Sequence, residues 1–166
     1  MALTFKEISR MTLFRGFSQT FIKLLDLFFV ENRYSPGQIL IQEGTVQNRF
    51  FMIFAGEVEV FHSAAGKKTV LGNLCAGQYF GEINLFDPGL ATATVSSLTP
   101  VRTLEISNDQ FRAFIQEKPE LAADFTFQLA ETIVKRFRST NEQLVEQLTH
   151  PDNLRKAEEI SKGLRA

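Results

Sequence analysis

The chain has 166 residues, enough for one ordinary domain with a hydrophobic core and an added helix. Its formal net charge of −1 gives no general field to attract nucleic acid or an anionic membrane. A single cysteine, Cys75, excludes an internal disulfide framework and favours a cytoplasmic location, while 17 phenylalanines indicate a dense apolar core.

The first part of the chain, residues 1–33, predicts a helical lead-in. Apolar residues recur at helical spacing over residues 21–29, and an earlier helix is expected over about residues 4–12. The most apolar stretch, residues 21–30, carries Lys23 and Asp26 and is too short to span a bilayer. We therefore expect no membrane partner.

Residues 34–107 change to short β-like runs separated by glycine or proline. Such runs with regular turn signals predict an antiparallel β-roll or sandwich. The predicted strands cover residues 38–42, 50–54, 57–61, 68–74, 92–98 and 101–106.

One predicted helix interrupts these strands over residues 80–86. It opens at Gly81 and ends at the turn Asp87-Pro88-Gly89. A helix start presents unpaired amide groups and a partial positive charge, which suits an anion. The sequence therefore predicts a candidate anion site inside a β fold.

Residues 108–150 predict two more helices, a short one over 108–116 and a long one that begins at Pro119 and ends near His150. A polar tail, 151–166, follows. The long helix has a near-heptad seam that needs a partner, either the β domain or a second copy of the chain. We predict a homodimer through this seam, which consists of Ile133, Phe137, Thr140, Leu144 and Leu148.

The motifs, in this order, resemble the cyclic nucleotide-binding domain family of the catabolite activator type. The segment from Gly77 to Asp87 is similar to the family's phosphate-binding cassette, whose core reads F-G-E-x-x-L, and residues 91–95 align with its end, R-x-A-T-V. The β-roll signature is carried by Pro36-Gly37, Glu43-Gly44, Phe51, Ile53, Gly56, Val58 and Val60. The resemblance implies a β-roll flanked by N-terminal helices and a long C-terminal helix, with the cassette at residues 80–95.

The resemblance also implies a set of ligand-binding residues. Gly81 would let the backbone approach a cyclic phosphate that a side chain would block, and Glu82 would accept a hydrogen bond from a ribose hydroxyl. The alternatives are a plain turn glycine and an acid that stabilises the helix dipole. The full candidate set is Gly81, Glu82, Ile83, Asn84, Leu85, Ala91, Thr92, Ala93, Thr140 and Asn141, the last two matching positions that contact the base. Alternatively, the Thr140 hydroxyl bonds a sister helix or a carbonyl of its own helix.

Ala91 stands where the family has its phosphate-binding arginine. Loss of such a charge-assisted contact costs about 2–5 kcal/mol. Thr92 offers a hydroxyl but no charge. Arg49 and Arg102 are the candidate substitutes, although both are interpreted as surface arginines.

Three functional hypotheses follow. The first is a non-enzymatic sensor that binds cAMP, cGMP or another small anion and signals through the long helix to a partner protein. The second is a ligand-free scaffold or dimerisation module, whose sign would be Phe86 or Leu90 turned inward. The third is a regulatory subunit of a separate enzyme.

Other classes of function find no support in the sequence. The two histidines, His62 and His150, form no metal motif, so no metal or cofactor is expected; His62 is interpreted as a surface strand residue and Cys75 as a core residue. Because few residues follow position 150, we also expect no helix-turn-helix and no direct DNA binding.

Overall fold

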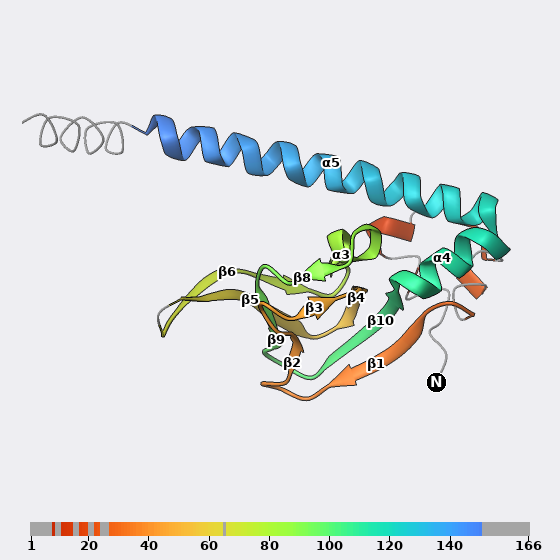
Figure 1. Ribbon diagram of the computed structural model, residues 1–166, viewed down its shortest axis with the longest axis horizontal. Coiled ribbons are helices and arrows are strands. Elements are labelled where there is room, and N and C mark those ends of the chain that lie inside the picture. Colours follow the sequence, from red (N-terminus) through yellow and green to blue (C-terminus); the bar gives the residue numbers. More distant parts are fainter. Residues whose placement is uncertain are drawn as a thin grey trace, which may run out of the picture. The chain divides into compact units, whose positions relative to one another are not determined.

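The computed structural model describes residues 8, 11–14, 17–19, 22–23, 27–64 and 66–150 (Figure 1). Most of the predicted lead-in helices and the whole tail 151–166 lie outside these residues. A short 3-10 helix, η1 (Thr12–Phe14), is described in the lead-in. The chain forms two compact units, Met1–Thr126 and Phe127–Ala166, and each is described by itself.

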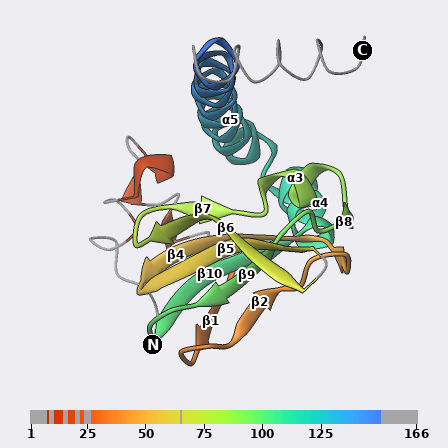
Figure 2. The ribbon, with the colours of Figure 1, turned by 90° about the vertical axis from the view of Figure 1, so that its left-hand side faces the viewer.

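The first unit contains two four-stranded antiparallel sheets (Figure 2). One has the order β1-β10-β4-β7, with β1 at Val30–Tyr34, β10 at Val101–Ser107, β4 at Arg49–Ala55 and β7 at Tyr79–Phe80. The other has the order β2-β9-β5-β6, with β2 at Ile39–Ile41, β9 at Thr94–Ser97, β5 at Glu57–Ala64 and β6 at Lys67–Cys75. A small ladder pairs β3 (Val46–Gln47) with β8 (Gly89–Leu90). The predicted antiparallel β-roll is confirmed.

Strand β1 begins inside the segment that was predicted to be helical. Val30 to Tyr34 pair with Glu105 to Val101 of β10, so the roll begins at Val30 rather than Tyr34. The apolar run before Val30 has helical spacing, but the open edge of β10 supplies backbone partners that local spacing does not reveal.

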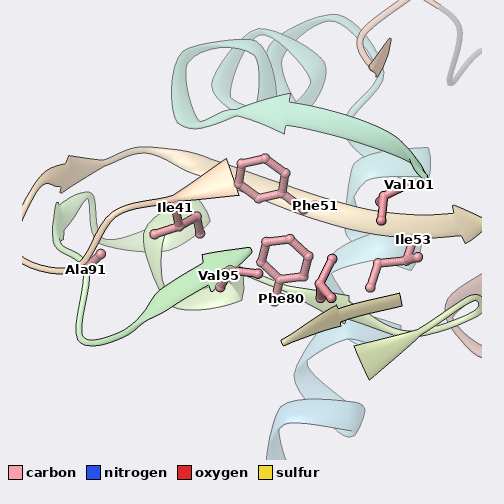
Figure 3. Close-up of a cluster of buried hydrophobic side chains, with 8 residues drawn as sticks. Ile41, Phe51, Ile53, Phe80, Ala91, Val95 and Val101 are labelled. Atoms are coloured by element: carbon pink, nitrogen blue, oxygen red, sulfur yellow. The ribbon is translucent and has the colours of Figure 1, made fainter. Parts of the chain in front are cut away.

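Two aromatic cores lie on opposite faces of β4, because successive side chains of a strand alternate. On the inner face, Phe51 stacks on Phe80 with ring centroids 4.8 Å apart. The buried cluster around this pair comprises Ile41, Phe51, Ile53, Val58, Phe80, Ala91, Val95 and Val101 (Figure 3). On the outer face, the Phe50 ring lies edge-on to Phe125 at 6.3 Å. Cys75, interpreted as a core residue, is instead exposed on β6.

Helices follow the strands as predicted. α3 (Glu82–Phe86) lies between β7 and β8, and α4 (Asn108–Glu117) follows β10 directly. Ser107 begins α4 with a capping box, in which its hydroxyl accepts from the Gln110 amide at 3.2 Å. α5 (Pro119–Thr149) opens with proline, whose missing N–H costs nothing at a first helical position. None of the described helices is long and apolar enough to cross a membrane.

Candidate ligand-binding site

The cassette helix α3 starts at a glycine that the fold itself requires. Gly81 has φ +79°, and a Cβ added there would lie 2.5 Å from the backbone oxygen of Arg49 on β4. From the sequence, a glycine was expected at position 81 because a side chain there would block an anion. The physical reason in the structure is the close approach of β4, which excludes a side chain whether or not a ligand binds.

The candidate residues on α3 differ in solvent exposure. Leu85 is fully buried, Ile83 is 68% exposed, and Glu82 and Asn84 are intermediate. The backbone oxygen of Leu85 accepts a hydrogen bond from Asn108 Nδ2 at 2.5 Å. Thus α3 turns Leu85 into the core while Ile83 faces solvent.

Asn108 joins three segments of the first unit. Besides donating to α3, its backbone N–H donates to the oxygen of Asn48 at 2.7 Å, and its Oδ1 accepts from Arg112 Nε at 2.9 Å. The residue is 8% exposed. The end of α3, the start of β4 and the first turn of α4 therefore share one buried amide.

Ala91 lies at one end of the buried cluster, near Ile41 (Figure 3). It is 7% exposed, and its backbone pairs with Thr45 O at 2.9 Å and with the Gly44 N–H at 2.8 Å. Thr92 is exposed and Ala93 is intermediate. Where the family has its arginine, this chain therefore has a backbone that is hydrogen-bonded on both sides and a side chain that is only a methyl group.

A ligand-free scaffold was expected to have Phe86 or Leu90 turned inward, and the structure shows neither. Leu90 is 66% exposed and Phe86 is 43% exposed. The Phe86 ring makes an edge contact with Phe111 of α4 at 5.7 Å. Neither side chain is turned into the roll.

The two arginines considered as substitutes for the missing one both pair with carboxylates. Arg49 Nη1 lies 3.3 Å from Glu105 Oε2, and Arg102 Nε lies 3.1 Å from Glu31 Oε1. The Arg49 side chain is 53% exposed and the Arg102 side chain is 30% exposed. The predicted surface position therefore fits Arg49 better than Arg102. Each cation already has a carboxylate partner.

Glu105 is a buried carboxylate at the centre of a polar cluster, with 2% exposure. It accepts hydrogen bonds from Tyr34 Oη at 2.6 Å and from Thr103 Oγ1 at 2.7 Å, in addition to its Arg49 contact. Burial, followed by the Glu105 hydrogen bond, raises the pKa of Tyr34 well above its ordinary value. These contacts connect β1, β10 and β4 at one buried carboxylate.

The structure also brings together a histidine and a carboxylate that sequence reasoning did not connect. His62 Nδ1 on β5 lies 2.6 Å from Oε1 of Glu43, in the turn after β2. The other carboxylate oxygen of Glu43 accepts from the Ser63 N–H at 3.0 Å, and the Glu43 N–H donates to Thr94 Oγ1 at 3.1 Å. Only the pairing of β2 and β5 with β9 brings these segments together.

Thr140 and Asn141 lie on α5 in the second unit, and both are exposed. In the predicted seam, Phe137, Leu144 and Leu148 are also exposed, whereas Ile133 is intermediate. The exposed large apolar residues of α5 are Phe127, Val134, Phe137, Leu144, Val145 and Leu148. Their spacing defines a different heptad register from the predicted one.

In this register, Phe127, Val134, Asn141 and Leu148 follow at steps of seven, and Phe137 and Leu144 occupy the alternate core position. The predicted members Ile133 and Thr140 fall beside this row. Counting strict steps of seven from Phe127 would have found it in the sequence. Val145 lies beside the register, and we call its apolar members, Phe127, Val134, Phe137, Leu144 and Leu148, the α5 apolar row.

Within the described part of the chain, no three His, Cys, Asp or Glu side chains gather as a metal site would need. The first unit is an antiparallel roll with the short helix α3 and the strand β8 inserted between β7 and β9, which is the architecture of β-roll domains.

Comparison with known proteins gives the family. The family description "cyclic nucleotide-binding domain" matches residues 31–118, and the chain belongs to this family. It is 27% identical over 140 residues to a CRP-like cAMP-activated global transcriptional regulator of Mycobacterium tuberculosis, covering 84% of this chain and 61% of that protein. It is 33% identical over 126 residues to the cAMP-activated global transcriptional regulator CRP of Haemophilus influenzae, covering 73% and 54%.

A crystal structure of a cyclic nucleotide-binding domain from Methylobacillus flagellatus shares the fold, with a TM-score of 0.75 and 20% identity over 86% of this chain and 80% of that one. The chain thus spans about six tenths of the length of the first curated relative, at 61%.

Proposed function

We propose that the chain is a non-enzymatic, cytoplasmic sensor domain that binds a small anionic ligand, cAMP or a similar cyclic nucleotide, at the cassette. The ligand site in the first unit would be formed by Gly81–Leu85 and Ala91–Ala93. The bound state would be passed through α5 to a partner protein. A ligand acts in this way only if it binds two arrangements of the domain unequally.

One observation carries this proposal against the scaffold alternative. Phe86 and Leu90, the apolar residues flanking the cassette turn, point out of the roll, with 43% and 66% exposure. The names of the curated relatives, which are cAMP-activated regulators, support the choice of ligand. The scaffold alternative rests on Ala91, whose methyl group is part of the apolar cluster.

The experiment is a calorimetric titration of the natural protein with cAMP and cGMP, beside Ala91→Arg. Restoring a charge-assisted contact of about 2–5 kcal/mol should tighten cAMP binding by at least about 30-fold. Ala123→Arg, which adds the same charge on an exposed position of α5, is the matched control and should change nothing. Absence of cAMP and cGMP binding in both the natural protein and Ala91→Arg would favour the scaffold.

We also propose that the partner of α5 is a second copy of the chain. The five exposed members of the α5 apolar row lie along one heptad stripe, which is the pattern of a two-stranded coiled coil. Asn141 sits in that stripe at a core position, where a buried amide fixes the register of two parallel helices.

A further inference from the structure

We infer that His62, held by Glu43, supplies the cationic hydrogen-bond donor for the ligand's anionic group, in place of the arginine that Ala91 lacks. This inference rests on the proposed function of the site. It assigns a specificity-determining role to a pair of residues that the cassette motif does not include.

The first step is the face of β5 on which His62 lies. Val58 is fully buried in the inner cluster, and Val60 packs against that cluster. Because side chains alternate along a strand, His62 continues the same inner face two residues further on. The β5–β9 register is regular from Val58 to Phe61, so the shift in β5–β6 pairing between Val60 and Phe61 comes from the extra residue Leu71 of β6. His62 thus lies where the inner face of the roll opens beyond Val60.

The second step is the position of Ala91 relative to this end of β5. Val60 pairs with Val95 and Phe61 with Thr94, so the antiparallel order brings residues 91–93 toward the part of β5 that follows Phe61. Independently, Gly44 and Thr45 bond to the backbone of Ala91, and Glu43 is the residue before them. Both connections place the Glu43–His62 pair at the corner of the roll that contains Ala91.

The third step is the chemistry of the pair. Both oxygens of Glu43 are engaged, one with His62 Nδ1 at 2.6 Å and one with the Ser63 N–H at 3.0 Å, so the carboxylate is fixed and orients the ring. The His62 side chain is 46% exposed. With both nitrogens protonated, the imidazolium donates from Nδ1 to Glu43 and from Nε2 to an anion.

Two lysines of β6 lie near His62. Lys67 pairs with Ala64 and lies on the same face as His62, but nearer the tip of the β5–β6 hairpin. Directly opposite His62 on β6 is Thr69, which is uncharged. The nearby Lys68 is paired with Glu59 and lies over the Phe61 ring, 4.2 Å from its centroid, on the other face of the hairpin. A single imidazolium N–H replaces a two-pronged guanidinium, so binding should be weaker than with an arginine at position 91.

A double-mutant cycle with cAMP tests the inference. Calorimetry would compare the natural protein, His62→Gln, Ala91→Arg and the double variant. Loss of one charge-assisted hydrogen bond should weaken cAMP binding by about 10- to 100-fold in His62→Gln. In the Ala91→Arg background, where the arginine already holds the anion, the same substitution should cost less than about threefold. His150→Gln, at the other histidine, is the matched control, and thermal unfolding checks that each variant is folded.

The outcomes separate this inference from the proposed function. If the natural protein binds cAMP and His62→Gln binds equally well, the role of His62 is refuted while the sensor function stands. An equal loss in both backgrounds also refutes it, because His62 would then act independently of the missing arginine. If cAMP binds only to Ala91→Arg, His62 does not replace the arginine and the natural ligand is not cAMP. If no protein in the cycle binds cAMP, the proposed cAMP function itself fails.

Discussion

The close approach of the cassette to β4 predicts a large effect for Gly81→Ala. An alanine at φ +79° is strained by about 1–2 kcal/mol. Its Cβ would also lie 2.5 Å from the Arg49 backbone oxygen, so backbone segments would have to separate by about 0.9 Å to reach ordinary contact. Such overpacking costs about 1–3 kcal/mol. The free energy of unfolding should therefore fall by about 2–5 kcal/mol in total.

Gly37→Ala is the matched control, because Gly37 has φ +81° and nothing within 4 Å of an added Cβ. It should show the backbone strain alone, about 1–2 kcal/mol. Urea unfolding measures both variants, and with a slope of about 2 kcal/mol/M the midpoint of Gly81→Ala should lie about 0.5–1.5 M below that of Gly37→Ala. Equal midpoints would refute the argument that β4 excludes a side chain at the start of α3.

Three other predictions concern separate parts of the molecule. Tyr34→Phe removes a hydrogen bond to the buried Glu105 carboxylate and should cost about 1–3 kcal/mol of unfolding free energy at neutral pH. Because burial and that bond raise the pKa of Tyr34, the natural protein should lose stability as pH rises above about 10, and Tyr34→Phe should lose less over the same titration. Ser107→Ala removes the capping box of α4 and should lower the urea midpoint by an amount equivalent to about 1 kcal/mol. Phe137→Glu combined with Leu144→Glu should convert a dimer to monomers in sedimentation, and an unchanged mass would exclude the α5 apolar row as the seam.

Local patterns were sufficient to predict the roll and the cassette helix. Glycine and proline separate the predicted strands from one another. The Asp87-Pro88-Gly89 turn ends α3 where the sequence indicates. The start of β1 was not predictable from spacing, because Val30 becomes a strand residue only through its pairing with Glu105. Tertiary hydrogen bonding overrides local periodicity at that point.

The cassette candidates could be named from the sequence because they lie close together in the chain. Residues 81–85 and 91–93 stand as candidates because the spacing of the cassette motif is preserved in one stretch of sequence. The Glu43–His62 pair was missed because the two residues lie far apart in the sequence, and only strand pairing joins them. The reason for Gly81 was missed in the same way, since the atom that excludes a side chain belongs to Arg49.

Asn108 makes the end of α3 and the start of α4 mechanically dependent on each other. The last carbonyls of a helix have no partner within the helix, and Asn108 satisfies that of Leu85 from a buried position. If α3 moves without α4, this amide loses its acceptor, which costs about 1–3 kcal/mol. If the two helices move together, the contact with Asn48 must yield instead. Displacing α3 therefore requires enough free energy to break one of these hydrogen bonds. Below that free energy, α3, α4 and the start of β4 respond as one rigid piece.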